Sequence, residues 1–238
     1  GYPAVAGKRV IELGTGPGLG AVACGLLNAA EVVATDGDAE LLELTKVNLV
    51  RNLSADRVEV QQSARARCQC RTAQLMWGDE AKARELCAAL RRDEQRETKG
   101  QQKCSTGQPA FDVVLAADCA ACVYEGAFEM LVASFLHLTG LDSVVVLSYQ
   151  RRHSSEDAFF ALAEEHFTVE RVPRQHLHPD FQLDKEPLPS VVPSQSRFVA
   201  TKFSEIDVYL LRRRRAQHPV AAVESWDIRS GNKTRHIF

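Results

Sequence analysis

The sequence predicts an α/β fold built on a doubly wound, parallel sheet. Apolar runs of strand length alternate along the chain with segments whose apolar residues recur at helical spacing, which is typical of a parallel sheet covered by helices. A glycine-rich turn follows the first apolar run, at the place where βαβ units bind nucleotides. The 238 residues, 45% hydrophobic and 25% charged, are ordinary for a globular protein with a substantial core.

The first two strands and helices are predicted from the spacing of their apolar residues. Residues 9–13 and 31–36 are short apolar runs next to turn residues, so each predicts a buried strand. An apolar helical run fills 19–30 between them, and the segment 38–52 repeats leucines at helical spacing. The segment "RVEV" at 57–60 is a candidate third strand.

The same pattern returns in the second half of the chain. The runs at 111–118 and 142–149 predict buried strands, and helix-spaced segments follow them at 125–138 and 154–167. An alternating run at 205–213 predicts the strand that closes the sheet.

Two polar segments interrupt this order. We expect insertions near 61–73 and 81–109. The second is expected to be solvated around one possible short helix, because Lys, Arg, Glu, Gln and Ser dominate its composition. We therefore expect one domain over residues 1–215 and a C-terminal tail over 216–238.

The glycine turn lies in "VIELGTGPGLG" (10–20) and indicates a nucleotide site, because a residue without a Cβ lets a ligand approach the backbone. The dinucleotide fingerprint G-x-G-x-x-G fails when it starts at Gly14, since Leu19 takes the sixth position. It survives in weakened form from Gly16 through Gly18 to Ala21. A dinucleotide and a phosphate-free nucleoside both remain open on the glycines alone.

Glu12 favours the phosphate-free ligand. Its carboxylate precedes the loop and would repel a pyrophosphate, whereas it would attract a positive amine. S-adenosylmethionine is such a ligand, because it carries an ammonium group and a cationic sulfonium. Asp36, at the end of the second strand, suits the paired hydroxyls of a ribose in either case.

The chain resembles methyltransferase family 16, the seven-strand protein lysine methyltransferases. The resemblance is carried by "VIELGTGPGLGAVACGLL", "VVATDGDAELLELTKVNLVRN", "LMWGDE", "FDVVLAADCAACVY" and "LSYQRRHSSEDAFF", and it spans about residues 7–213 apart from the two insertions. It implies a Rossmann-like, doubly wound sheet of seven strands, mostly parallel with an antiparallel last strand. It also implies S-adenosylmethionine-dependent methylation of a protein side chain, with lysine as the acceptor.

The resemblance further implies roles for individual residues. Gly14, Thr15 and Gly16 would contact the methionyl part of the cofactor, with Gly18 in the same loop, and Glu12 would support the methionyl amino group. Asp36 would bind the ribose, and Ala117 would face the cofactor. Trp77 would lie along the adenine, and Asp79 would contact the adenine amino group. At the acceptor, Asp118 and Tyr124 correspond to an Asp and a Tyr of the family. The family separates that pair by two residues, whereas five intervene here.

Methyl transfer to lysine needs the amine in its neutral form, because an ammonium has no lone pair. With an ordinary pKa near 10.4, keeping the amine neutral at pH 7 costs about 4 to 5 kcal/mol unless the site lowers that pKa. Asp118 would accept a hydrogen bond from the amine and aim it, but a carboxylate also raises the pKa of the amine. Tyr124 would supply a second orienting oxygen or an aromatic wall.

Several alternatives stay open. Histidine or arginine could replace lysine as the acceptor, an NAD-type oxidoreductase would use the same loop, and a cofactor-binding module without activity would fit the altered spacing. Asp118 as a helix cap and Tyr124 as a packed aromatic are the purely structural interpretation. "CAAC" at 119–122 resembles a redox motif, and with Cys68 and Cys70 it would make four thiols for zinc, but the spacing is not standard and we expect no metal.

Charge and composition limit the partners. The net charge of −2 gives no broad attraction to nucleic acid or to a membrane, and the basic run at 212–215 falls at the expected end of the last strand. No apolar run is long enough to span a bilayer, and no signal pattern opens the chain. The seven cysteines are expected to be reduced. We expect a monomeric cytoplasmic protein with a protein substrate, a nuclear location staying open; the chain begins with Gly1 rather than Met, which leaves open a preceding segment.

Overall fold

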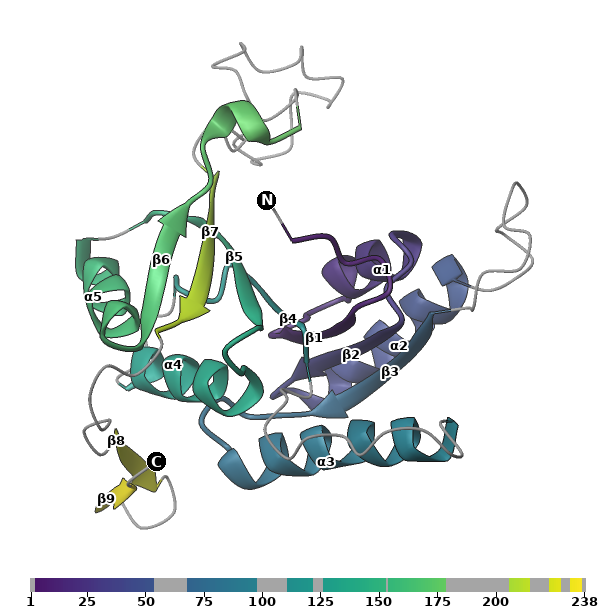
Figure 1. Ribbon diagram of the computed structural model, residues 1–238, viewed down its shortest axis with the longest axis horizontal. Helices are drawn as coiled ribbons and strands as arrows, with labels where there is room; N and C mark the ends of the chain where they lie inside the picture. Colours follow the sequence, from purple (N-terminus) through teal and green to yellow (C-terminus); the bar gives the residue numbers. More distant parts are fainter. Residues whose placement is uncertain are drawn as a thin grey trace, which may run out of the picture.

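The computed structural model contains a seven-stranded sheet with helices on both faces (Figure 1). It describes residues 3–53, 68–97, 111–121, 126–152, 154–178, 206–214, 223–227 and 232–236. The strands of the main sheet are β1 (Arg9–Leu13), β2 (Glu31–Asp36), β3 (Gln69–Gln74), β4 (Val113–Ala117), β5 (Val144–Gln150), β6 (Phe167–Arg171) and β7 (Ile206–Arg213). The α-helices are α1 (Leu19–Leu26), α2 (Ala39–Leu53), α3 (Glu80–Glu97), α4 (Ala127–Leu138) and α5 (Asp157–His166), and two 3₁₀ turns lie at Ser154–Glu156 and Arg174–His176.

The strand order is β3-β2-β1-β4-β5-β7-β6. Strands β3, β2, β1, β4 and β5 pair in parallel, while β7 lies between β5 and β6 and is antiparallel to both. The predicted fold class is therefore confirmed, including the antiparallel last strand of the sheet. Because the order reverses between β1 and β4, a crevice for a ligand is expected outside the carboxyl ends of these two strands.

Two apolar clusters hold the helices to the sheet. Helices α1 and α2 bury Ala21, Cys24 and Leu49 against one face, and α3, α4 and α5 bury their apolar stripes against the other. Figure 1 shows α1 and α3 on opposite sides of the strands. The central strands are buried on both faces, which explains why their sequences are mostly apolar rather than alternating.

The predicted insertion near 81–109 is wrong over its first half. Residues 80–97 form α3, whose Ala83, Leu86 and Leu90 lie in the core. The predicted insertion near 61–73 likewise contains most of β3, an edge strand with partly exposed side chains, and the candidate strand at 57–60 lies outside the described residues. An edge strand packs against one neighbour only, so it tolerates the polar composition that obscured it.

Smaller differences concern element ends. Helix α1 ends at Leu26, four residues earlier than expected, and strand β6 follows α5 directly. Two further strands, β8 (Val223–Asp227) and β9 (Asn232–His236), pair as an antiparallel hairpin within the expected tail. The domain boundary at residue 215 stays a prediction. Each helix in the described part of the chain is too short or too polar to cross a membrane.

Candidate functional site

The glycine loop between β1 and α1 adopts a conformation that requires glycine. Gly14, Gly16 and Gly18 have φ values of 62°, 52° and 91°, in the left-handed region that other residues rarely enter. Nothing lies within 4 Å of the position that a Cβ would take at Gly16. The backbone of the loop is therefore open on that side, as the approach of a ligand requires.

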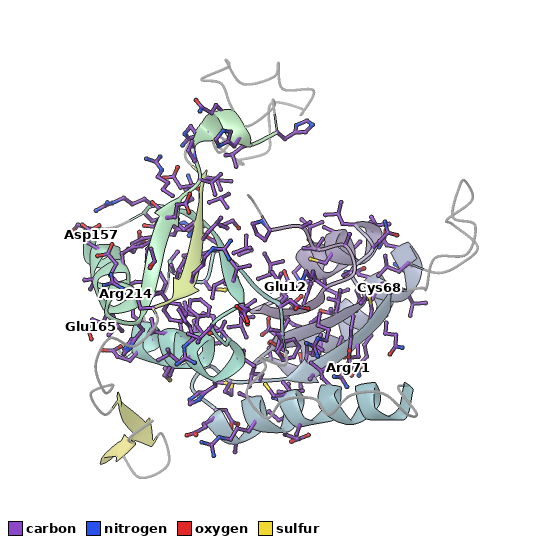
Figure 2. All side chains as sticks on the ribbon, viewed as in Figure 1. Glu12, Cys68, Arg71, Asp157, Glu165 and Arg214 are labelled. Atoms are coloured by element: carbon purple, nitrogen blue, oxygen red, sulfur yellow. The ribbon has the colours of Figure 1, made fainter. Side chains whose placement is uncertain are left out.

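Glu12 lies beneath this loop and joins it to the helix. Its side chain is 2% exposed, and Oε2 accepts hydrogen bonds from the Thr15 hydroxyl at 2.5 Å and the Ala21 N–H at 2.8 Å. A Cβ at Gly20 would collide with the Glu12 carboxylate, so glycine is needed there for close approach. Figure 2 shows Glu12 near the middle of the sheet.

Burial raises the pKa of Glu12. The hydrogen bonds from Thr15 and Ala21 oppose this shift, and the negative charge of Asp36 adds to it. Thr15 is itself buried, and its N–H donates to the carbonyl of Thr35 on β2 at 2.8 Å. The predicted residues Glu12 and Thr15 thus form a single buried unit between β1, β2 and α1.

Asp36 meets the loop from the end of β2. Its Oδ2 accepts a hydrogen bond from the Gly16 N–H at 2.9 Å, and its Oδ1 accepts one from Asp38 N–H at 3.0 Å. From α2, the Thr45 hydroxyl donates to the carbonyl of Gly16 at 2.6 Å. The carboxylate and the glycine backbone are therefore held together, as expected for the two halves of one nucleoside site.

Trp77 contacts the loop at Gly14. A Cβ at Gly14 would lie 3.5 Å from Trp77 Cζ2 and 3.2 Å from Cys119 Sγ. The Trp77 ring is half-buried and packs against the core beneath it. The tryptophan and the glycine loop are therefore neighbours, although Trp77 follows Gly14 by 63 positions in the sequence.

Asp79 and Ala117 occupy less specific positions. Asp79 is exposed, and its Oδ1 accepts a hydrogen bond from the Lys82 N–H at 2.9 Å, so it caps the start of α3. Ala117 is the last residue of β4 and is exposed at the carboxyl end of that strand. A contact between Asp79 and an adenine stays a prediction.

Asp118 follows β4 in a left-handed conformation, with φ 61°. Its N–H donates to the carbonyl of Ser148 on β5 at 2.7 Å. Its two carboxylate oxygens accept hydrogen bonds from Nη1 and Nη2 of Arg152, each at 2.7 Å. The interpretation of Asp118 as the cap of the next helix is wrong, because α4 is capped by Gly126 without a side-chain hydrogen bond.

Tyr124 and Cys122 lie outside the described residues, so the acceptor pair is described only on its Asp118 side. Cys119 is buried, and its thiol donates to the carbonyl of Leu13 at 3.2 Å. Cys68 and Cys70 bring their sulfur atoms within 3.5 Å of each other near the start of β3. Within the described ranges, no three His, Cys, Asp or Glu side chains are placed so that they could hold a metal ion.

Arg152 and Cys119 were missed by sequence reasoning. Cys119 was considered only as part of a redox motif or a zinc site, whereas in the structure its sulfur lies beside Gly14. Arg152 lies within the quoted segment "LSYQRR", but nothing in that segment distinguishes it from Arg151. Arg151 pairs with Asp157 instead, at 2.7 Å.

Comparisons with known proteins agree with this geometry. The model of a family described as lysine methyltransferase matches residues 97–166, and that of ribosomal protein L11 methyltransferase matches residues 4–75. The chain is 30% identical to protein N-lysine methyltransferase METTL21A of Danio rerio over 179 residues, 75% of this chain and 63% of the relative. It is 30% identical to protein-lysine N-methyltransferase EFM6 of Saccharomyces cerevisiae over 171 residues, 68% of this chain and 57% of the relative.

The chain thus spans about three fifths of the length of these curated relatives. Among solved structures, a SAM-dependent methyltransferase from Aquifex aeolicus is similar with a TM-score of 0.50 and 9% identity, over 88% of this chain and 85% of that one. At that identity the similarity is one of fold alone.

Proposed function

We propose that this chain, which is similar to protein lysine methyltransferases, transfers a methyl group from S-adenosylmethionine to a lysine side chain of a protein. The observation that carries the proposal is the convergence of three separate segments on the glycine loop. Asp36 hydrogen-bonds its backbone, Trp77 lies beside Gly14, and Glu12 is buried beneath it.

The residues fit the cofactor by their chemistry. Asp36 uses one lone pair on each oxygen for a backbone N–H, and the others remain to accept hydrogen bonds from two ribose hydroxyls. The half-buried ring of Trp77 offers an apolar face to adenine. The open backbone at Gly16 admits the methionyl part, while Glu12 places a carboxylate beneath a ligand that carries an ammonium and a sulfonium.

S-adenosylmethionine would be held here by the glycine loop, Asp36 and Trp77, and it would supply an electrophilic methyl group. The remaining work of the protein is to place the acceptor nitrogen in line with that methyl group and to exclude water. Asp118 lies at the carboxyl end of β4, next to the strand that carries the glycine loop. We assign it the role of accepting a hydrogen bond from the amine, with Tyr124 as its proposed second partner.

Calorimetry separates this function from the alternatives. The purified chain is titrated with S-adenosylmethionine, S-adenosylhomocysteine and NAD, and we expect binding of the first two only. Tight binding of NAD without binding of S-adenosylhomocysteine would contradict the proposal and support an oxidoreductase.

Activity is tested with methyl-labelled cofactor and a cell extract. We expect at least one labelled protein band, labelled on lysine, with the wild-type chain and a strongly reduced signal with Asp118→Ala. A chain that binds the cofactor but labels no protein would favour a binding module without activity. Label on histidine or arginine would keep the reaction class and correct the acceptor.

A further inference from the structure

The Asp118 carboxylate presents a chemical difficulty for methyl transfer. A carboxylate that aims the acceptor amine also stabilises its ammonium form, which cannot react. We propose that Arg152 compensates the charge of Asp118, so that Asp118 orients the acceptor amine without holding it as an ammonium. This inference rests on the proposed function and assigns Arg152 as a positioning residue of the same site.

The contact between the two side chains is bidentate. Both oxygens of Asp118 accept hydrogen bonds from the guanidinium, at 2.7 Å each, and the side chains are 53% and 48% exposed. The contact between Asp118 and Arg152 follows from the parallel pairing of β4 with β5, which places the residues after both strands at the carboxyl end of the sheet. The geometry is that of the planar fork for which arginine is suited and lysine is not.

Arg152 is also anchored from behind. Its backbone N–H donates to Glu156 Oε2 at 3.0 Å, and the same oxygen accepts a hydrogen bond from the Tyr149 hydroxyl. Glu156 is 4% exposed, so this buried carboxylate holds the turn after β5 in place. The backbone from which the Arg152 side chain reaches Asp118 is therefore fixed by a buried contact.

The pair is neutral and still able to accept a hydrogen bond. Asp118 contributes one negative charge and Arg152 one positive charge, so their sum near the amine is zero. Each carboxylate oxygen has two acceptor positions, of which Arg152 occupies one. A free position remains for an N–H of the incoming amine.

Other titratable groups near the pair do not replace this compensation. In the described part of the chain, the groups facing Arg152 are Asp118, Glu156 and Tyr149. Burial and the neighbouring Glu156 raise the pKa of Tyr149, so its hydroxyl stays neutral over the working range. Arg151 is directed to Asp157 on α5, and the thiol of Cys119 next to Asp118 is buried and hydrogen-bonded to backbone carbonyls.

The test measures how the rate depends on pH for two matched variants. Arg152→Gln and Arg151→Gln remove the same charge from adjacent residues, but only the first leaves Asp118 uncompensated. The readout is the initial rate of label incorporation into the substrate protein identified in the extract, supplied at saturating concentration, where the rate follows kcat and reports the pKa of the amine in the enzyme–substrate complex. Thermal unfolding and the Kd for S-adenosylhomocysteine are measured for both variants.

We expect the pH at which the rate rises to be about one unit higher for Arg152→Gln than for wild type. The reason is that a charge a few ångströms away shifts the pKa of a half-exposed amine by roughly one unit. Below the pKa of the amine, the rate would then be about tenfold lower at a given pH. Arg151→Gln should keep the wild-type profile. Arg152→Lys, which keeps the charge but not the fork, should keep the position of the rise and lower the maximal rate.

Asp118→Asn provides a test of opposite sign. It leaves Arg152 uncompensated, so the rise of the profile should move to lower pH while the maximal rate falls. Coincident profiles for Arg152→Gln and Arg151→Gln, or shifts of Arg152→Gln and Asp118→Asn in the same direction, would overturn the inference. A wild-type chain that labels no protein at any pH would instead overturn the proposed function on which it rests.

Discussion

The close approach of Gly20 to Glu12 makes a sharp prediction about stability. In Gly20→Ala the new methyl group would collide with the buried Glu12 carboxylate, and it would also lie 2.8 Å from Leu115 Cδ2. Overpacking of this kind costs about 1–3 kcal/mol. If the carboxylate moves away, the buried donors of Thr15 and Ala21 lose their acceptor, at about 1–3 kcal/mol each.

Replacing a helical glycine by alanine returns about 1 kcal/mol of helix propensity. We therefore expect a net loss of about 3 kcal/mol in the free energy of unfolding, which corresponds to a Tm lower by about 6–12 °C for a chain of this size. The matched control is Gly25→Ala in the same helix, where the three atoms nearest to the methyl group would all belong to the apolar, partly exposed side chain of Leu53, which can shift without leaving a polar group unpaired. Its Tm should be unchanged or slightly higher.

A double variant isolates the contact. In Gly20→Ala combined with Glu12→Ala, the carboxylate is absent, so the two substitutions should be less destabilising together than the sum of their separate effects. Differential scanning calorimetry measures the Tm of wild type, of the three single variants and of the double variant. Equal Tm values for Gly20→Ala and Gly25→Ala, or strict additivity in the double variant, would refute the assignment of Gly20 as the residue that admits Glu12.

Three other outcomes follow from the site. Asp36→Asn should weaken the binding of S-adenosylhomocysteine, measured by calorimetry, about 10-fold or more, since hydrogen bonds to a charged acceptor contribute about 1.5–3 kcal/mol. The control Glu43→Gln, on the exposed face of α2, should leave binding unchanged. Equal Kd values for the two variants would remove Asp36 from the cofactor site. In Trp226→Phe, which leaves Trp77 as the only tryptophan, S-adenosylhomocysteine should quench the fluorescence, and an unchanged spectrum under saturating ligand would mean that Trp77 does not face the adenine. Burial raises the pKa of Glu12, so the folded state binds its proton more tightly than the unfolded state does. The stability of wild type relative to Glu12→Gln should therefore be greatest below the ordinary pKa of about 4.3 and fall as pH rises through the folded-state pKa. Denaturant titrations at several pH values measure this difference in stability, and a difference that grows with pH would contradict the expected sign.

The sequence predicted best where the physical signal is local. The runs at 9–13 and 31–36 are apolar on both sides because β1 and β2 are covered on both faces, and both strands have the predicted bounds. The left-handed turns at Gly14 and Gly16 depend on the absence of a Cβ, which is a property of the residue itself.

Prediction failed where averaged composition hid a narrow pattern. Helix α3 is charged over most of its length, yet Ala83, Leu86 and Leu90 recur at helical spacing and are enough to bury one stripe. Strand β3 is polar because it lies at the edge of the sheet. A polar segment can therefore belong to the fold when only one of its sides faces the core.

The sequence by itself determined the alternation of strands and helices, the glycine loop, and the residue types suited to an adenosine nucleoside that carries a positive charge. Only the tertiary structure decided which of two adjacent arginines faces Asp118, since Arg152 lies 34 positions from Asp118 in the sequence. The physical reason is that a local sequence pattern indicates whether each residue is buried, whereas a contact between distant side chains depends on the order of the strands in the sheet. The parallel register of β4 and β5 brings Asp118 and Arg152 to one edge of the sheet, and no local property of either residue records that register.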